Sequence, residues 1–486
     1  MVKEIQIDVE SKQLAVIKKV LKQRIAYKTV WAYGSRVNWT ANQYSDLDLV
    51  IFEINTVKLG ELKEDFAESD LPFTVDIMSW GKIPENFKNK IRKKFVVLQK
   101  KPELEGWNNG ALSDFADVIM GQSPKGESCN ANGNGKPLLN GPTEFGVKSP
   151  HPLQFTEDPK KLCKENDILF CVRGSTTGRM NWADQQYAIG RGIAAIRHKE
   201  GSSYKHFVRG IIDFNLPGLL VSATGSTFPN ISRDQLEDLV VLIPPPHEQK
   251  AIASILSSLD DKVDLLHRQN KTLEAIAETL FKQWFVEEEQ ENWAVECLGN
   301  IADINPAYEL KKGEVSTYVE MKNVSTSTFN PEGWYKREFA SGMKFRNGDT
   351  LLARITPCLE NGKTCFVTFL DEEEIGWGST EYIVMRMKEQ FHPYISYIIA
   401  KNKDFRDFAI SSMSGSSGRQ RAQASVIKEY DLRVPPLEII EELNHQLDRI
   451  LSKLKNNANQ IRTLEKLRET LLPRLMSGEV RVEYEN

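Results

Sequence analysis

Cysteine and histidine are scarce in this sequence, and they do not gather. The six cysteines form no C-x-x-C pair, and the seven histidines form no cluster with them. A structural zinc site is therefore not expected, and reduced thiols in a cytoplasm are the simplest interpretation. The chain also has no run of about 18 apolar residues and no signal-peptide pattern, so we expect neither a membrane span nor secretion.

Motifs of several common enzyme classes are missing as well. Residues 106–486 contain no Ser/His/Asp order, no H-E-x-x-H, no glycine-rich loop ending in Lys-Ser/Thr and no N-P-P-Y run of adenine methylation. This part of the chain is expected to recognise a partner without chemistry of its own. The net charge of -4 neither suggests nor excludes a polyanion as that partner. With 486 residues, the chain should hold roughly three or four domains.

Two long helical patterns dominate the chain, and each follows a short run of prolines. Prolines end the preceding element, because each fixes φ and lacks an N–H donor. After residues 243–246, and again after Pro435–Pro436, apolar residues recur at alternating steps of four and three, which is typical of a coiled-coil seam. The first seam comprises Ile252, Leu256, Leu259, Val263, Leu266, Asn270, Leu273, Ala277, Leu280 and Trp284, and the second comprises Ile440, Leu443, Leu447, Ile450, Leu454, Asn457, Ile461 and Leu464.

Each seam contains one asparagine, Asn270 in the first and Asn457 in the second. A polar seam residue favours one register over its slips, at some loss of stability. Each helix would span roughly 55–60 Å and needs a partner of similar length. Tethering within one chain raises the effective concentration of that partner, which favours an antiparallel pair inside the chain. The alternative is a coiled coil that merely dimerises two chains.

The chain also repeats itself outside the helices, with an offset of roughly 180–190 residues. Short apolar runs after Gly/Asn–Asp turns predict that each copy is mostly β, and residues 231–239 and 424–430 each predict a short helix. A period this long indicates two domains in tandem. The matching segments are 112–124 with 298–308, 164–178 with 346–362, 188–197 with 376–386, and 222–246 with 412–436.

Carboxylates gather in the β-rich part of the first hundred residues. Asp46 and Asp48 are two residues apart on one run, so their side chains point to the same face, while Leu47 and Leu49 point to the core. Asp76 lies in another short apolar run. Three carboxylates on neighbouring strands would form an oxygen cage for one or two Mg²⁺ ions. The alternative is that Asp46 and Asp48 merely begin a strand and are solvated.

A Gly34–Ser35 turn precedes these carboxylates and can hold a nucleotide phosphate through backbone N–H groups. With the S-D-L-D-L motif at 45–49, this segment resembles the minimal nucleotidyltransferases of the DNA polymerase β-like superfamily. Trp39 stands near the place where small members carry a glycine. The resemblance implies an NTP and Mg²⁺ as cofactors, Asp46, Asp48 and Asp76 as the catalytic metal ligands, and Gly34, Ser35 and Arg36 facing the triphosphate.

Residues 106–486 resemble the specificity subunit of a type I restriction-modification enzyme. The resemblance rests on two variable β-rich domains, each followed by a proline-rich turn and a long helix. The family's P-P-x-x-E-Q-x-x-I run stands here as PPPHEQKAI at 244–252 and is weakened to PPLEIIEEL at 435–443. It implies a subunit that reads a bipartite, gapped site in double-stranded DNA. It also implies two methyltransferase (M) subunits that carry S-adenosylmethionine and restriction (R) subunits that hydrolyse ATP.

The expected fold is an α+β multidomain chain. An N-terminal α/β nucleotidyltransferase-like domain would precede two β-rich target-recognition domains, which two long antiparallel coiled-coil helices separate. The expected boundaries are 1–100 for the nucleotidyltransferase-like domain, 101–111 for a linker, 112–246 for recognition domain 1, 247–290 for spacer helix 1, 291–436 for recognition domain 2 and 437–486 for spacer helix 2.

Residues that read bases are expected on loops, with Arg or Lys for guanine and Asn or Gln for adenine. Arg173 is favoured because Gly174 and Gly178 allow close backbone approach. The loop at 414–423 follows, although its counterpart at 222–230 lacks basic residues. For each residue the alternative is a solvated or paired surface charge. The candidates are Lys125, Arg173, Ser175, Thr176, Arg179 and Arg191 in the first domain, and Arg354, Lys363, Arg419, Gln420 and Arg421 in the second.

Two other functions are compatible with the sequence. The chain could be a nucleotidyltransferase that a DNA-binding module delivers to its target, or a scaffold in which neither site is active.

Overall fold

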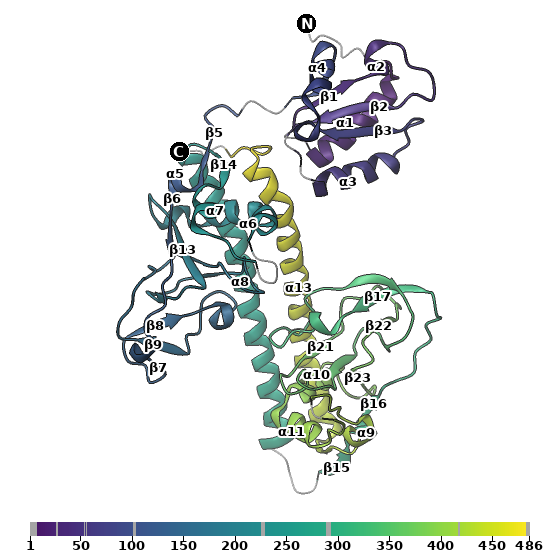
Figure 1. Cartoon of the computed structure of the whole chain (residues 1–486). Coiled ribbons are helices and arrows are strands. Elements are labelled where there is room, and N and C mark those ends of the chain that lie inside the picture. Colours follow the sequence, from purple (N-terminus) through teal and green to yellow (C-terminus); the bar gives the residue numbers. More distant parts are fainter. Residues whose placement is uncertain are drawn as a thin grey trace. The chain divides into compact units, whose positions relative to one another are not determined.

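The computed structural model of the chain describes residues 7–25, 28–52, 54, 56–100, 104–224, 229–287, 293–416 and 418–482. The chain divides into two compact units, one comprising Met1–Ser258 with Leu467–Asn486 and the other Leu259–Lys466. Figure 1 shows their helices and strands. Within the described ranges, no helix is both long enough and apolar enough to cross a membrane.

The N-terminal domain is a four-stranded sheet covered on both faces. Its elements are α1 (Ser11–Ile25), β1 (Val30–Tyr33), α2 (Ser35–Asn38), β2 (Leu47–Ile51), α3 (Thr56–Ala67), β3 (Val75–Ser79), α4 (Glu85–Lys93) and β4 (Val96–Gln99). The strand order is β3-β2-β1-β4, and only β2 and β3 are parallel. Ile17 and Leu21 of α1 pack with Leu47 and Leu49 in one core, as the sequence pattern predicted. An aromatic cluster that includes Phe87 of α4 covers the other face.

The first β-rich domain contains two four-stranded sheets. The antiparallel sheet has the order β11-β10-β13-β6, and the mixed sheet has the order β12-β8-β9-β7. β5 and β14 form a separate two-stranded pair. The elements are β5 (Asn108–Ala111), α5 (Leu112–Phe115), β6 (Ala116–Met120), β7 (Cys129–Asn130), β8 (Lys136–Leu139), β9 (Gln154–Thr156), β10 (Ile168–Cys171), β11 (Met180–Trp182), β12 (Ala188–Ile189), β13 (Ile193–His198), α6 (Lys205–Ser222), α7 (Arg233–Glu237) and β14 (Val240–Ile243).

The second β-rich domain repeats this plan, which confirms the predicted tandem repeat. Its antiparallel sheet, β16-β23-β20-β21, has the same order as β6-β13-β10-β11, and its mixed sheet is β18-β17-β22-β19. Each mixed sheet contains one parallel pair. The elements are β15 (Ala294–Cys297), α9 (Leu298–Ile301), β16 (Ala302–Ile304), β17 (Val315–Val319), β18 (Tyr335–Glu338), β19 (Met343–Phe345), β20 (Thr350–Ala353), β21 (Thr364–Phe366), β22 (Gly376–Gly378), β23 (Tyr382–Met387), α10 (Ile395–Lys401), α11 (Lys403–Ser411), α12 (Ala424–Ile427) and β24 (Asp431–Val434).

A buried aspartate immediately precedes the equivalent central strand in both copies. Asp167 accepts a hydrogen bond from Arg197 at 2.6 Å, and Asp349 accepts one from Arg386 at 2.6 Å. Each carboxylate also accepts a bond from the backbone N–H three residues earlier, at 2.7 and 2.8 Å respectively. Paired in this way, the charge can be buried at the turn that both copies share.

Helix α6 was not predicted, because its sequence is interrupted by Gly210, Pro217 and Gly218. Proline inside a helix removes one hydrogen bond, and glycine lowers helix propensity. Tertiary packing overrides both effects here. A Cβ on Gly210 would lie 2.9 Å from the Leu256 side chain and 3.2 Å from Leu472, so the glycine lets α6 approach the long helices closely.

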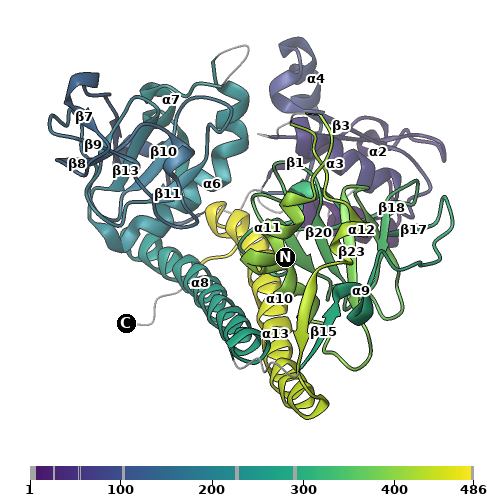
Figure 2. The same ribbon diagram turned by 90° about the horizontal axis from the view of Figure 1, so that it is seen from below.

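The two long helices are α8 (Pro246–Lys282), followed by a π-helical segment at Gln283–Glu287, and α13 (Leu437–Met476). Within the second unit they run side by side (Figure 1 and Figure 2), and Ala277 shares a core with Leu447. Within the first unit, Leu256 shares a core with Leu475, so the pairing is antiparallel. The second helix ends before the expected 486, since residues 477–482 are not helical, whereas residues 288–290 of the expected 247–290 lie outside the described ranges.

The seam asparagines meet each other. Asn457 Nδ2 donates a hydrogen bond to Asn270 Oδ1 at 2.8 Å, and both side chains are buried. Any slip of the register would place one of these amides against apolar side chains, where an unpaired polar group costs roughly 1–3 kcal/mol. The pair therefore fixes the register, as the sequence predicted.

The first turn of α8 explains the Glu–Gln of the proline-rich motif. Glu248 is buried and accepts hydrogen bonds from Trp107 Nε1 at 2.8 Å and from Arg481 at 3.0 and 2.9 Å. Gln249 contacts the His198 ring at 3.0 Å. Trp107 and the strand β5 thus belong to the folded domain, which corrects the expected linker at 101–111; residues 101–103 lie outside the described ranges.

Glu274 on α8 carries a half-buried carboxyl inside the second unit. It accepts a hydrogen bond from the Tyr397 hydroxyl of α10 at 3.1 Å. Burial raises the pKa of Glu274 to about 7, although this bond and the charge of Lys401 oppose the rise. A protonated carboxyl is therefore the favoured form below neutral pH.

Replacing Glu274 with Gln should change how stability depends on pH. Because the folded pKa lies above the unfolded value, the carboxyl's stabilisation is fully present below about pH 4.3 and is lost as the pH rises through about 7. Wild type should lose roughly 3 kcal/mol relative to the variant across this window. The urea midpoints of wild type and Glu274→Gln should coincide near about pH 4, and the midpoint of Glu274→Gln should be the higher one near about pH 8. Glu441→Gln is the control, because Glu441 is exposed on α13. If the urea midpoints of Glu274→Gln and wild type change with pH in the same way, Glu274 does not carry a neutral carboxyl.

Candidate functional site

The acidic residues of the N-terminal domain lie on one face of the sheet. Asp48 of β2 is the direct register partner of Asp76 on the parallel strand β3. Partnered residues on neighbouring strands share a face, so the two carboxylates stand side by side. Asp46 precedes β2 and accepts a hydrogen bond from the Thr74 hydroxyl. Asp48 and Asp76 are thus direct neighbours, and Asp46 lies near enough for its charge to act on Asp48.

Gly34 and Asp48 touch at the end of β1. Gly34 has a φ of 82°, and a Cβ there would lie 2.0 Å from Asp48 Oδ2, so no other residue fits. Burial raises the pKa of Asp48, and the charges of Asp76 and Asp46 raise it further. A cation placed among these carboxylates would relieve the repulsion. Among the residues that the structure describes, however, no three His, Cys, Asp or Glu side chains are gathered closely enough to hold a metal.

Arg36 has a different task from the one expected of it. Its guanidinium is buried and donates hydrogen bonds to Ser45 O at 3.0 and 2.7 Å and to Asp8 O at 2.8 Å. It also stacks on the Phe73 ring at 3.8 Å. Through these bonds Arg36 holds the loop before β2 in place. Trp39 in that loop has a φ of 60° and is 61% exposed.

In the first β-rich domain, the loop that carries Arg173 is held by a second loop. Backbone hydrogen bonds of 3.0 and 3.3 Å join residues 172–174 to residues 229–231. Thr224 and Asn230 exchange two further backbone bonds of 3.0 and 2.8 Å. We call this bonded pair of loops the loop frame. It leaves the Arg173 side chain exposed.

Arg191 lies beside the same frame. The neighbouring Gly192 O accepts a hydrogen bond from Val172 N at 2.9 Å, and Arg191 N donates to Ser123 Oγ at 3.2 Å. The structure therefore brings the segments that carry Arg173, Arg191 and Lys125 to one edge of the domain. All three side chains are exposed, and Lys125 lies 3.6 Å from the equally exposed Glu127.

The second domain has the same loop frame. Backbone hydrogen bonds of 2.8 and 3.1 Å join residues 354–356 to residues 420–422. Ser414 and Arg421 exchange two further bonds of 3.1 and 3.0 Å, in the place of Thr224 and Asn230. The two loops that the sequence aligned without a shared motif are therefore equivalent in structure.

The frame also shows that the candidates Arg173 and Arg354 are not equivalent. Arg354 takes the place of Val172, and its Nε is buried without a hydrogen-bond partner among the described residues. The place of Arg173 is taken by Ile355. The charge of Arg354 lowers the pKa of Glu381, to a lesser extent than the hydrogen bonds from Arg421 do.

Several candidate readers already have partners within the fold. Arg421 forms a two-pronged ion pair with Glu381 at 2.7–3.0 Å, and Lys363 Nζ donates to Met321 O at 3.0 Å. Arg179 donates to Phe145 O at 2.9 Å. These side chains brace the loops that carry them. Ser175, Thr176 and Arg419 are exposed, and Gln420 is half-buried.

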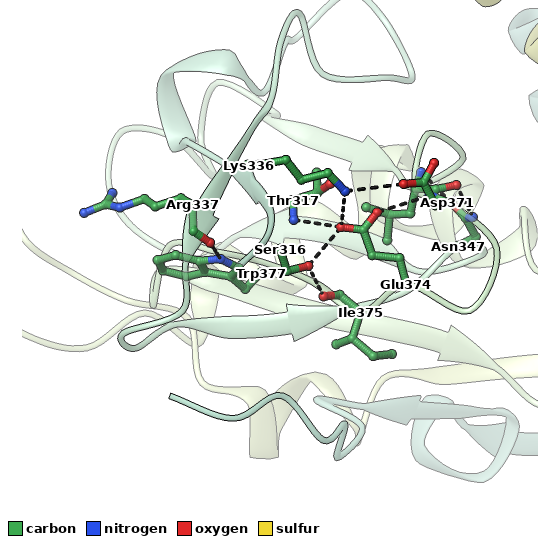
Figure 3. A network of polar contacts seen from close by, with 10 residues as sticks. Ser316, Thr317, Lys336, Arg337, Asn347, Asp371, Glu374, Ile375 and Trp377 are labelled. Carbon is green, nitrogen blue, oxygen red and sulfur yellow. Dashed lines mark hydrogen bonds and ion pairs between the residues drawn. The ribbon is translucent and has the colours of Figure 1, made fainter. Parts of the chain in front are cut away.

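A basic and aromatic cluster on β18 was missed by the sequence reasoning (Figure 3). Glu374 accepts hydrogen bonds from Lys336 Nζ at 2.9 Å and Thr317 N at 2.8 Å. Burial raises the pKa of Glu374, but these hydrogen bonds outweigh it and lower the value to about 2. Arg337 points away from this network, with its guanidinium 5.6 Å from the Trp377 ring. The run of two aromatic and two basic residues at 334–337 was the available signal.

Two protein families match this chain, in agreement with its division into domains. Residues 104–275 and 290–470 match the family described as type I restriction modification DNA specificity domain. Residues 16–103 match the family described as polymerase beta, nucleotidyltransferase. The first match contains both loop frames, and the second contains the three carboxylates.

Individual relatives show the same two parts. The type I restriction enzyme MjaX specificity subunit of Methanocaldococcus jannaschii is 34% identical over 36% of this chain and 42% of its own length, so less than half of that relative is matched. A protein described as the adenylyltransferase MntA of Haemophilus influenzae is 46% identical over 20% of this chain and 87% of its own length. The crystal structure of a type I restriction-modification system S subunit from M. genitalium covers 78% of this chain and 98% of its own, at 18% identity and a TM-score of 0.49.

Proposed function

Because the chain belongs to the type I restriction-modification DNA specificity family, we propose that its two β-rich domains read the two halves of a gapped site in double-stranded DNA. The observation that carries this proposal is the repeated loop frame. Each copy exposes polar or basic side chains on a loop that backbone bonds hold in place. Base reading requires donors on rigid supports that fit a groove.

Membership of the specificity family also leads us to propose partner subunits for this chain. M subunits would bind S-adenosylmethionine and R subunits would hydrolyse ATP, while this chain selects the DNA sequence. Among the loop residues, we propose a bracing role for Arg179, Lys363 and Arg421, which donate hydrogen bonds within the fold, and for Arg354, whose Nε is buried; the other candidates are proposed to contact bases. The proposed readers are Lys125, Arg173, Ser175, Thr176, Arg191, Arg419 and Gln420.

Co-expression with a cognate M subunit, followed by methylome sequencing, tests the proposal. A specificity subunit should produce methylation at a two-part motif with a non-specific gap. Methylation without a gapped motif, or failure to form a complex with the M subunit, would refute the assignment.

Arg173→Ala should relax one half of the recognised motif. A bidentate contact from arginine to guanine contributes about 1–3 kcal/mol of discrimination, so methylation should spread to sites that differ at one position. Arg233→Ala provides the control, because that exposed arginine is paired with Glu237 on α7. Weaker methylation at every site, without a change of motif, would instead indicate a phosphate contact.

We also propose a second function, in which the N-terminal domain transfers a nucleoside monophosphate. The pairing of Asp48 with Asp76 beside Gly34 supports it, together with 46% identity to the relative described as a protein adenylyltransferase. An acceptor hydroxyl would bond to the α-phosphorus as the bond to pyrophosphate breaks. Bound Mg²⁺ would supply charge stabilisation, and Asp46, Asp48 and Asp76 would hold it. By analogy with that relative, we propose a protein as the acceptor.

A further inference from the structure

Tyr33 ends β1 in the row of acidic residues described above. It is the register partner of Asp48, which is in turn the partner of Asp76. Partnered residues share a face of the sheet, so the phenol and the two carboxylates lie on three adjacent strands of one face. Gly34, which touches Asp48, follows Tyr33 directly in the chain.

The hydroxyl of Tyr33 is buried without a partner. The residue is 6% exposed, and its Oη finds no hydrogen-bond partner among the residues that the structure describes. Its ring packs edge-on against Phe87 of α4, with 6.0 Å between ring centroids. Buried tyrosine hydroxyls usually find an acceptor, because an unmade hydrogen bond is costly. Neither Asp48 nor Asp76 accepts a bond from it here, so the donor has no partner on the face that carries the carboxylates.

We propose that Tyr33 is a positioning residue of the nucleotide site, whose hydroxyl donates a hydrogen bond to a phosphate oxygen of a nucleoside triphosphate bound beside Asp48 and Asp76. This inference rests on the nucleotidyl-transfer function proposed above. A phosphate oxygen is a charged acceptor, and hydrogen bonds to charged groups are among the stronger ones. The phenol donates without adding charge, and its packing against Phe87 fixes its direction before the nucleotide arrives.

Tyr33→Phe tests the inference through binding and stability together. Titration of the full chain with a fluorescent N-methylanthraniloyl ATP and Mg²⁺ should show affinity weakened at least about tenfold, the loss expected for one hydrogen bond to a charged group. The urea midpoint of the free protein should stay the same or rise, because the lost hydroxyl had no partner. Tyr44→Phe is the matched control, since Tyr44 lies in the same domain and is 82% exposed.

The outcomes separate this inference from the function on which it rests. Wild-type affinity in Tyr33→Phe would overturn the role of Tyr33 and leave the nucleotide site standing. A lower urea midpoint with unchanged affinity would show that the hydroxyl serves the fold, which also overturns it. Absence of nucleotide binding by wild type would overturn both proposals.

Discussion

Asp48→Asn is expected to abolish nucleotidyl transfer by the N-terminal domain. Incubation of the full chain and its partner subunits with radiolabelled ATP and Mg²⁺ should show label transfer reduced by roughly 100-fold or more, since under the proposed function the carboxylate would contribute several kcal/mol through a bound ion. Asp48 lies at the centre of the site, between Gly34 and Asp76. No neighbouring carboxylate can occupy its place.

The same substitution should leave the fold intact. Burial and the neighbouring carboxylates raise the pKa of Asp48, so its charge is unfavourable in the free protein and a neutral amide of the same shape should not lower the urea midpoint. Asp70→Asn, exposed in the same domain, is the control. If Asp48→Asn transfers as much radiolabel as wild type does, or if neither protein transfers label under any condition, the domain does not catalyse this reaction.

Inserting one heptad into each long helix is expected to change the DNA motif itself. Seven residues add about 10 Å of helix, which corresponds to about three base pairs of DNA. The gap between the two half-motifs should grow by that amount while both halves stay the same. Activity on the original motif should be lost, because its two halves would no longer match the readers together. Methylome sequencing of the altered chain with its M subunit gives the gap directly.

The position of the insertion matters because of the asparagine pair. Because the helices are antiparallel, an insertion on the N-terminal side of Asn270 is matched by one on the C-terminal side of Asn457, and the two together keep the amides opposite each other. An insertion in α8 alone moves the two amides apart. The single insertion therefore serves as the control and should lower stability without yielding a longer gap. A gap of unchanged length in the double insertion would show that something other than these helices sets the distance.

Much of this architecture was predictable because its causes are local or periodic. The seam residues of α8 and α13 follow the helical repeat, and the alternation of Asp48 with Leu49 follows the strand repeat. Both patterns depend only on neighbouring residues. The tandem copies were visible because each carries the same turn before its central strand.

The roles of individual charged side chains were not predictable, because their partners lie far away in sequence. Arg421 pairs with Glu381, 40 residues earlier, and Arg36 binds the carbonyl of Asp8 across 28 residues. An arginine on a glycine-rich loop looks the same in the sequence whether it is exposed or paired. Burial and register, which decide between the two, arise only from the fold.

The loop frame has a consequence for how such a protein can acquire new targets. Its bonds at residues 172–174 and 229–231, and their equivalents in the second copy, run from backbone to backbone. Side chains on the frame can therefore be exchanged without removing the bonds that support them, as the replacement of Arg173 by Ile355 between copies illustrates. Under the base-reading role proposed above, stability and sequence preference would be largely uncoupled at these positions. Point substitutions there would then change the DNA motif while the domain remains folded.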